Sequence, residues 1–391
     1  MLFRDDMKAI ADKVRAKLFA LCRDDAEAIV STDPVHVGYL SGYRSVLVDV
    51  DRAFRCAVVI TRSQTILVTG ASDAAPALEV LRDPGCIYRY GVFYVSSSGS
   101  GINLSMMPKT ESTFLDALAS AIRDKVKSNR LVGLDCAGEF DLQQVKGLVG
   151  ENIFDARLQV IKARSVKLPE EVEKIRYAAE ITERGMAKAF GHAKQGVTEL
   201  ELSTIISTEI VAGGGIPRFV VVTAGERSAL ADAYATKAKL AKGDLLRVDV
   251  GCTVEGYWAD TARTAVVGEP SRDQQQRYDA LLAGELAQLA LARPGITAGD
   301  LFNIAVDGVR KGALPNYQRT HCGHGLGIGA HEFPTLNLAN REVEIQEGMV
   351  LCVETPYYEL GWGGMMVEDI IVIRKGGNEC LTKLPRELRR V

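Results

Sequence analysis

The spacing of apolar residues before residue 162 switches repeatedly between the helical and the strand period. Residues 1–18 carry apolar side chains at helical spacing, and Leu115, Leu118 and Ile122 fall on one face of a second amphipathic helix. This order predicts an alternating α/β domain over residues 1–162. The other elements expected there are a strand and short helix at 26–43, two strands at 56–70, a helix at 72–85 that ends at its Pro-Gly, and a strand at 131–136.

A repeat of helical type begins after a linker at residues 163–169, where Pro169 suits the first turn of a long helix. The segments that begin at Ala193 and Ala292 share Ala, Gly, Thr and Leu in register. In each copy a threonine, Thr198 or Thr297, precedes an acidic residue by three positions, which is typical of a helix N-cap. Two copies are too few for a solenoid. They predict two related halves, each followed by strands.

The stretch Arg247–Thr264 predicts a β-hairpin that carries two aspartates. If the turn is centred between Val254 and Glu255, Asp249 lies directly opposite Asp260, with Cβ atoms roughly 5 Å apart. Two buried carboxylates this close repel each other, and one would have to keep its proton unless a cation joins them. The hairpin therefore predicts a cation site that needs further ligands.

Further ligands of the right kind follow in the chain. A turn centred on Gly361 places Glu354 opposite Glu368, and the segment before them holds His321, His324 and His331. Each residue alone is commonly a solvated charge or a structural histidine, but their joint arrangement favours one site. Two aspartates, one histidine and two glutamates suit two divalent ions such as Mn, Co, Fe or Zn, roughly 3.5–4 Å apart.

Length, charge and cysteine content indicate how many domains the chain has, which partners it lacks and in which compartment it is found. A chain of 391 residues exceeds what one core usually supports, so two domains are expected. Its net charge of −3 predicts no nucleic-acid or membrane partner. No apolar run resembles a signal peptide or spans a bilayer, and the eight cysteines lack CxxC spacing, which together predict a cytoplasmic protein with reduced thiols. Cys322 and Cys352 neighbour the proposed ligands and are interpreted as small core residues.

The segments VDVG…ADTART, GHGLG…HE, VETP and VEDIIVI resemble those of the pita-bread enzymes, which include methionine aminopeptidase, aminopeptidase P, prolidase and the metal-free creatinase. The resemblance implies an α+β fold, with a creatinase-like N-terminal domain at 1–162 and a pita-bread catalytic domain with a pseudo-twofold repeat at 163–391. It also implies a homodimer with a small-molecule substrate. The implied metal ligands are Asp249, Asp260, His324, Glu354 and Glu368, and His331 is implied to steady the substrate or the tetrahedral intermediate.

Two positions depart from the peptidases of this family. The segment that ends in SALADA resembles a peptidase segment that carries a histidine, and Asp232 occupies the position of that histidine. Thr320 occupies a position where a second histidine is common, and His321 is displaced from it by one residue. The segments SGYRSVLVDVDRAF, THCGHGLG and GWGGMMVEDIIVI are similar to ectoine hydrolases, a pita-bread branch. The resemblance implies a hydrolase that opens the cyclic amidine of ectoine, or of hydroxyectoine, to N-acetyl-2,4-diaminobutyrate. The alternatives are an Xaa-Pro dipeptidase or aminopeptidase and a catalytically inactive binding module.

Further roles are hypotheses for this chemistry. Asp232 is expected to pair with the amidinium, Arg218 to hold the substrate carboxylate, and His321 to contact substrate. A metal-free mechanism stays open, in which Glu354, Glu368 or Glu255 attacks the substrate. Glu255 lies at the hairpin tip, on the order of 16 Å from either aspartate along an extended strand. It could act only through a bulge in the hairpin or in the site of a partner subunit.

Overall fold

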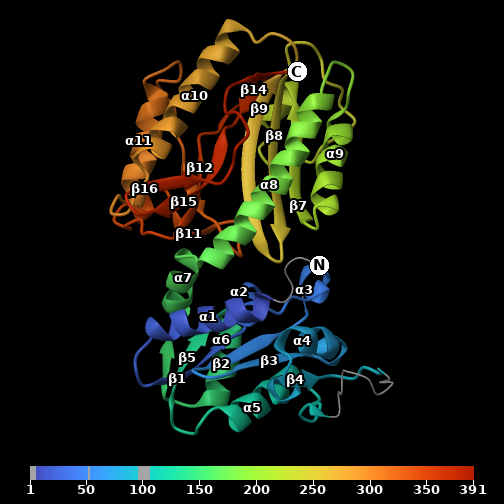
Figure 1. The fold of residues 1–391 in the computed structure, drawn as a ribbon, viewed down its shortest axis with the longest axis vertical. Coiled ribbons are helices and arrows are strands. Elements are labelled where there is room, and N and C mark those ends of the chain that lie inside the picture. The colour runs from blue at the N-terminus through green and yellow to red at the C-terminus, as the bar shows by residue number, and fades with distance from the viewer. Residues whose placement is uncertain (1–5, 52, 96–105) are drawn as a thin grey trace. The chain divides into compact units, whose positions relative to one another are not determined.

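The computed structural model describes residues 6–51, 53–95 and 106–391. Their contacts divide the chain into two units (Figure 1). The first unit ends at Arg164, and the second begins at Ser165. The boundary predicted at residue 162 falls inside α7 (Arg157–Ser165), so the helix continues to the division between the units. Residues 1–5 of the first predicted helix lie outside the described residues.

The first unit is built on a mixed six-stranded sheet with the order β4-β3-β2-β1-β5-β6. Strand β2 pairs antiparallel with both β1 and β3. Strand β5 pairs parallel with β1, β6 pairs parallel with β5, and β4 pairs parallel with β3. The strands are β1 (Ala26–Ser31), β2 (Ala57–Thr61), β3 (Thr65–Gly70), β4 (Ile87–Tyr90), β5 (Leu131–Asp135) and β6 (Ile153–Asp155).

Local sequence signals set several helices of this unit. Asp33 caps α2 by accepting hydrogen bonds from the backbone N–H groups of Val35 and His36. Helix α5 buries Leu118 and Ile122 as predicted, while Leu115 is only half-buried. The helices are α1 (Asp6–Ala20), α2 (Pro34–Ser41), α3 (Val46–Val50), α4 (Ala74–Leu81), α5 (Phe114–Lys125), α6 (Glu139–Val149) and α7. The pattern of apolar residues did not predict α3, α6, β4 or β6.

The second unit contains two related halves around one sheet, which confirms the predicted α+β class. Each half supplies a pair of helices followed by strands, and the strand order is β11-β10-β12-β15-β9-β8-β7. The first half contains α8 (Pro169–His192), α9 (Glu199–Ala212), β7 (Ile216–Ala224), β8 (Leu245–Val254) and β9 (Tyr257–Val266). The second contains α10 (Arg272–Leu291), α11 (Ala298–Arg310), β10 (Gly323–Gly325), β11 (Glu332–Thr335), β12 (Val350–Glu354), β13 (Tyr357–Glu359), β14 (Gly363–Met365) and β15 (Glu368–Arg374). Strands β16 (Gly377–Cys380) and β17 (Arg389–Arg390) extend the sheet.

The repeated helix starts have the capping geometry that their sequence predicts. Thr198 and Thr297 each accept a hydrogen bond from the backbone N–H three residues on, and the acidic side chain there accepts one from the backbone N–H of the threonine. In Figure 1, α8 and α9 lie beside β7 to β9, and α10 and α11 lie beside the strands of the second half. The two helix pairs therefore mark the two halves of the predicted repeat.

The two faces of the sheet differ in chemistry because side chains alternate along each strand. On the helix side, Leu351, Val353 and Ile371 pack with Leu301 of α11 in one apolar core, and Cys252 contacts Thr182 of α8. Glu354 follows Val353 directly, and Asp249 lies three residues before Cys252, so both side chains point to the opposite face. The candidate site is therefore on the face that the helices do not cover.

The predicted register of the first hairpin is wrong by two positions. Its turn is Glu255-Gly256, with φ angles of 49° and 91°, the left-handed pair that a two-residue hairpin turn requires. Asp260 consequently pairs with Gly251, and Asp249 pairs with Ala262. Because the difference is an even number of residues, both aspartates keep the same face of the sheet. They are diagonal neighbours rather than direct partners.

Candidate metal centre

Four neighbouring strands bring three carboxylates into one row across the open face of the sheet. Glu354 of β12 pairs with Glu368 of β15, as the sequence predicted. Glu368 pairs next with Ala262 of β9, whose other partner is Asp249 of β8. The small side chain of Ala262 therefore separates Asp249 from the glutamates. Asp260 lies two residues from Ala262 on the same strand and faces the same way.

His324 completes the group from β10, where it pairs with Cys352. Its Nδ1 lies 3.1 Å from the backbone oxygen of Gly325, and its Nε2 lies 3.8 Å from Oδ2 of Asp260. With Nδ1 donating to the carbonyl, Nε2 is left with a lone pair directed at the carboxylates. Burial lowers the pKa of His324 to about 4, so the imidazole is neutral near pH 7 and can bind a metal.

The carboxyl groups of the centre are electrostatically frustrated without a cation. Burial raises the pKa of Asp249 to about 7, against the opposing effect of the Arg247 guanidinium. Burial and the neighbouring acids raise the pKa values of Asp260 and Glu368 well above their ordinary range. Burial acts in the same direction on Glu354, but the imidazoles of His321 and His324 outweigh it and hold that pKa below its usual value.

The donors fit a divalent ion. Ligand atoms of Asp260, His324, Cys352 and Glu368 all lie within 4.8 Å of one another, and each of these residues is buried. Oε2 of Glu368 has no hydrogen-bond partner among the described residues, which is costly for a buried carboxylate unless it binds an ion or a proton. Burial and the nearby acids raise the pKa of the Cys352 thiol well above its usual range. Carboxylate and imidazole groups are therefore the ligands that suit this centre.

Two further histidines lie against His324. The ring of His331 stacks on that of His324, with centroids 3.9 Å apart and an interplanar angle of 27°, and His331 is exposed to solvent. Nδ1 of His321 lies 3.0 Å from Oε1 of Glu354. Asp232, also exposed, is close enough to Asp249 and His331 to influence the pKa of each. The structure thus brings His321, His331 and Asp232 to the edge of the centre.

Arg247 is a site residue that sequence reasoning missed. Its side chain is fully buried, and Nη1 donates to Oδ2 of Asp249 at 3.2 Å. Its other donors bind backbone oxygens of the loop that carries Asp232, namely those of Ser228 at 3.0 Å, Leu230 at 2.8 Å and Ala231 at 2.7 Å. Arg247 therefore joins the loop to the centre.

A buried ion pair holds the segment of His331 and was likewise not predicted. Nζ of Lys167 lies 3.0 Å from Oε2 of Glu332, and the two side chains are 1% and 3% exposed. The other oxygen of Glu332 accepts a hydrogen bond from the backbone N–H of Gly329 at 2.8 Å. Since Glu332 follows His331 directly, this pair fixes the backbone beside that histidine. The only sequence signal for the pair was the acid in the HE dipeptide.

Two further residues that the sequence proposed contact the first hairpin and its neighbours. Nε of Arg218 donates to Oγ1 of Thr253 at 3.1 Å, and its guanidinium lies 5.9 Å from the ring of Trp258. Thr253 is four residues from Asp249, about 13 Å along β8, but it pairs with Trp258, which is two residues from Asp260, about 7 Å along β9. Glu255 forms an ion pair with Lys174 of α8, and no bulge interrupts its hairpin. Glu255 is therefore held at the hairpin tip, away from the ligands, and the role of Arg218 toward the substrate carboxylate stays a prediction.

The sequence model of metallopeptidase family M24 matches residues 173–375. The chain belongs to this family. Its sequence is 32% identical over 227 residues to the Xaa-Pro dipeptidase of Pyrococcus furiosus, covering 58% of this chain and 65% of that protein. It is 30% identical over 241 residues to the putative dipeptidase YkvY of Bacillus subtilis, covering 61% and 66%. The chain thus spans about 65% of the length of these curated relatives.

Solved structures of two peptidases share the fold over nearly all of the chain. The X-Pro aminopeptidase of Thermotoga maritima superposes with a TM-score of 0.79 at 22% identity, covering 97% of this chain and 99% of that one. Dipeptidase PepE of Mycobacterium ulcerans superposes with a TM-score of 0.79 at 25% identity, covering 98% of each. These matches confirm the pita-bread resemblance. The finer likeness to ectoine hydrolases stays a prediction, because the relatives are named for peptidase activity.

M24 membership agrees with the chemistry of the centre. Metallopeptidases of this family use pairs of divalent ions, and the buried acids and His324 supply the donors that such ions require. Among the described residues, no helix is long and apolar enough to cross a membrane.

Proposed function

We propose that the chain is a metal-dependent hydrolase that cleaves the C–N bond of a short peptide of the Xaa-Pro type. The observation that supports this most is the row of buried carboxylates beside His324, in a chain of family M24 whose relatives include named dipeptidases. This replaces the cyclic amidine of ectoine as the first choice of substrate, because the similarities found are to peptidases.

The proposed ligands are Asp249, Asp260, His324, Glu354 and Glu368. Divalent ions held by these residues would supply Lewis acidity, which lowers the pKa of a bound water molecule and polarises a carbonyl group. The protein contributes fixed ligand positions, since the four acids lie on paired strands whose register leaves them little freedom. The hydrogen bond of His324 to its own backbone orients the nitrogen that faces the acids.

Residues at the edge of the centre act on the substrate in this proposal. Burial lowers the pKa of His331 against the opposing effect of Glu354, so the imidazole is neutral near pH 7 and can donate a hydrogen bond to the substrate carbonyl. Asp232 offers an exposed carboxylate on the same side, which can pair with the positively charged amino end of a dipeptide. Arg247 holds the loop of Asp232 in place through its three bonds to backbone oxygens.

A cyclic amidine such as ectoine is the second candidate, and Asp232 is the observation that favours it. An exposed carboxylate near His331 suits a delocalised amidinium as well as an amine. In that reaction water adds to the amidine carbon, one ring C–N bond breaks, and the departing nitrogen takes a proton. In a metal-free form of this reaction, the buried acids Glu354 and Glu368 are the proposed nucleophiles.

One experiment separates the candidates. The purified chain is incubated with Gly-Pro and with ectoine, with and without added Mn²⁺, and products are followed by NMR. Release of proline that depends on Mn²⁺ supports the dipeptidase. Turnover of ectoine alone supports the second candidate, and its independence of metal would support direct attack by a carboxylate. Turnover of neither compound, with or without metal, contradicts both.

A further inference from the structure

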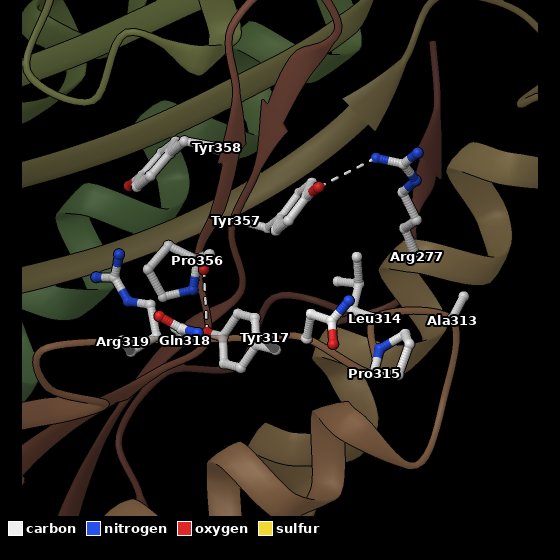
Figure 2. Close-up of a pocket in the computed structure, with 11 residues that line it drawn as sticks. Arg277, Ala313, Leu314, Pro315, Tyr317, Gln318, Arg319, Pro356, Tyr357 and Tyr358 are labelled. Carbon is white, nitrogen blue, oxygen red and sulfur yellow. Dashed lines mark hydrogen bonds between the residues drawn. The ribbon is translucent and has the colours of Figure 1, made fainter.

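A cavity of about 490 Å³ lies in the second unit beside the metal centre. The segment 313–319, which follows α11, forms one wall, and residues 356–358, which follow Glu354, form another. Figure 2 shows Arg319 at one end of this cavity and Arg277 at the other, with Tyr317 between them. The remaining wall combines apolar and aromatic side chains with the amides of Asn316 and Gln318, so the two guanidinium groups are the charged groups of the lining.

Arg319 connects this cavity to the centre. Its side chain is only 19% exposed, and Nη2 lies 3.9 Å from Oε2 of Glu354, too far for a hydrogen bond. Its Nε is buried and has no hydrogen-bond partner among the described residues. The guanidinium centre lies 5.8 Å from the ring of Tyr358, which is a weak contact. Arg319 is thus a largely buried cation with hydrogen-bonding capacity to spare.

Arg277 differs because its charge is already satisfied. Its Nε donates to Asp273 at 2.9 Å, and Nη1 donates to Glu359 at 2.5 Å and to the hydroxyl of Tyr357 at 3.3 Å. The guanidinium also stacks over Trp362, 4.2 Å from the ring centroid. Of the two arginines, Arg319 is therefore the one that can bind a further anion.

We propose that this cavity is the subsite for the carboxylate-bearing end of the substrate, with Arg319 as the residue that binds the carboxylate. The planar fork of a guanidinium matches a carboxylate in geometry, and a charge-assisted pair is strongest where water is excluded. The walls formed by Tyr317, Tyr357 and Leu314 suit a hydrocarbon or ring beside the carboxylate. Arg319 is thus an alternative to Arg218, which the sequence analysis proposed for this role.

The position of Arg319 also suits the chemistry. One amino-acid residue spans at most about 3.5 Å, so a residue whose carboxylate rests on Arg319 leaves the bond that precedes it near Glu354. This inference rests on the proposed function. It applies to both candidates, because a dipeptide and ectoine each carry a free carboxylate next to a nitrogen.

Binding of a product analogue tests the subsite without requiring turnover. Isothermal titration calorimetry of the full chain compares L-proline with L-prolinamide, which lacks the negative charge. We expect the wild type to bind L-proline more tightly, and Arg319→Gln to weaken that binding by about 10- to 100-fold, in keeping with a hydrogen-bonded charge pair. Arg319→Lys should retain part of the affinity. L-prolinamide should bind each of the three proteins about equally.

Arg374→Gln serves as the matched control, since Arg374 pairs with Glu379 on the surface, and its affinity for L-proline should equal that of the wild type. Circular dichroism and thermal unfolding show whether each variant is folded. The assignment is overturned if the wild type fails to prefer L-proline at concentrations up to about 10 mM, or if Arg319→Gln binds it as the wild type does. If Gly-Pro is not hydrolysed, the proposed function is contradicted. The binding of L-proline by the wild type and by Arg319→Gln can still be compared in that case.

Discussion

Replacing Arg247 by methionine should weaken both the fold of the second unit and the site that it carries. The substitution keeps a long apolar side chain but removes four hydrogen bonds, one to Asp249 and three to backbone oxygens between Ser228 and Ala231. Since the arginine is fully buried, water cannot replace these bonds without entering the protein. Breaking a buried pair of this kind costs about 3–5 kcal/mol. That is a large part of the stability of a typical domain, about 5–15 kcal/mol.

The pH dependence of this cost distinguishes a charge effect from a packing effect. Arg247 acts against burial and holds down the pKa of Asp249, so that pKa should rise beyond about 7 in Arg247→Met. At pH 5.5 Asp249 of the variant can be protonated, so it no longer needs the positive charge of Arg247. At pH 8 Asp249 must either stay charged without the guanidinium or bind a proton at a cost in free energy. We expect the destabilisation to be at least about 1 kcal/mol smaller at pH 5.5 than at pH 8.

Urea unfolding in the presence of EDTA, followed by circular dichroism at both pH values, measures this difference. Arg247→Lys keeps the charge but not the three bonds to the loop, and should lie between wild type and Arg247→Met. Arg374→Gln, which breaks a surface pair, should change the unfolding free energy by less than about 1 kcal/mol. The reasoning is refuted if Arg247→Met lies within 1 kcal/mol of the wild type, or if its penalty grows as the pH falls.

Three further outcomes are expected. Glu368→Gln should lower kcat by at least about 100-fold whether the residue holds a metal or attacks directly, and a fully active variant in a steady-state assay would remove it from the site. Lys167→Met removes the buried cation beside Glu332 while the bond from the N–H of Gly329 remains, and this loss should cost about 3–5 kcal/mol in urea unfolding and lower kcat more than it raises KM; an unchanged midpoint contradicts this. In EDTA the protein should lose stability from about pH 4 to about pH 7, because acids such as Asp249 keep protons that the unfolded chain releases, while the lowered pKa of His324 opposes this more weakly. Added Mn²⁺ should restore the loss, and a higher urea midpoint at pH 8 than at pH 5 in EDTA would contradict it.

The sequence by itself determined the features that depend on neighbours within a few residues or on the alternation of a strand. The caps of α9 and α11 follow from threonine and an acid three positions apart. The pairing of Glu354 with Glu368 follows from a turn at Gly361, whose φ of 82° suits glycine. The family followed as well, because its motifs are short runs of consecutive residues.

Tertiary structure decided which charged groups are buried and what they contact. An arginine in a strand or a loop has the same sequence signature whether it faces water or a carboxylate, so the pattern did not single out Arg247 or Arg319. It also did not predict that the side chain of Arg218 bonds to Thr253. The register of the first hairpin depended on Glu255 accepting a left-handed backbone, which composition does not reveal. Such choices are set by packing between segments far apart in sequence, where the cost of burying a charge selects its partner.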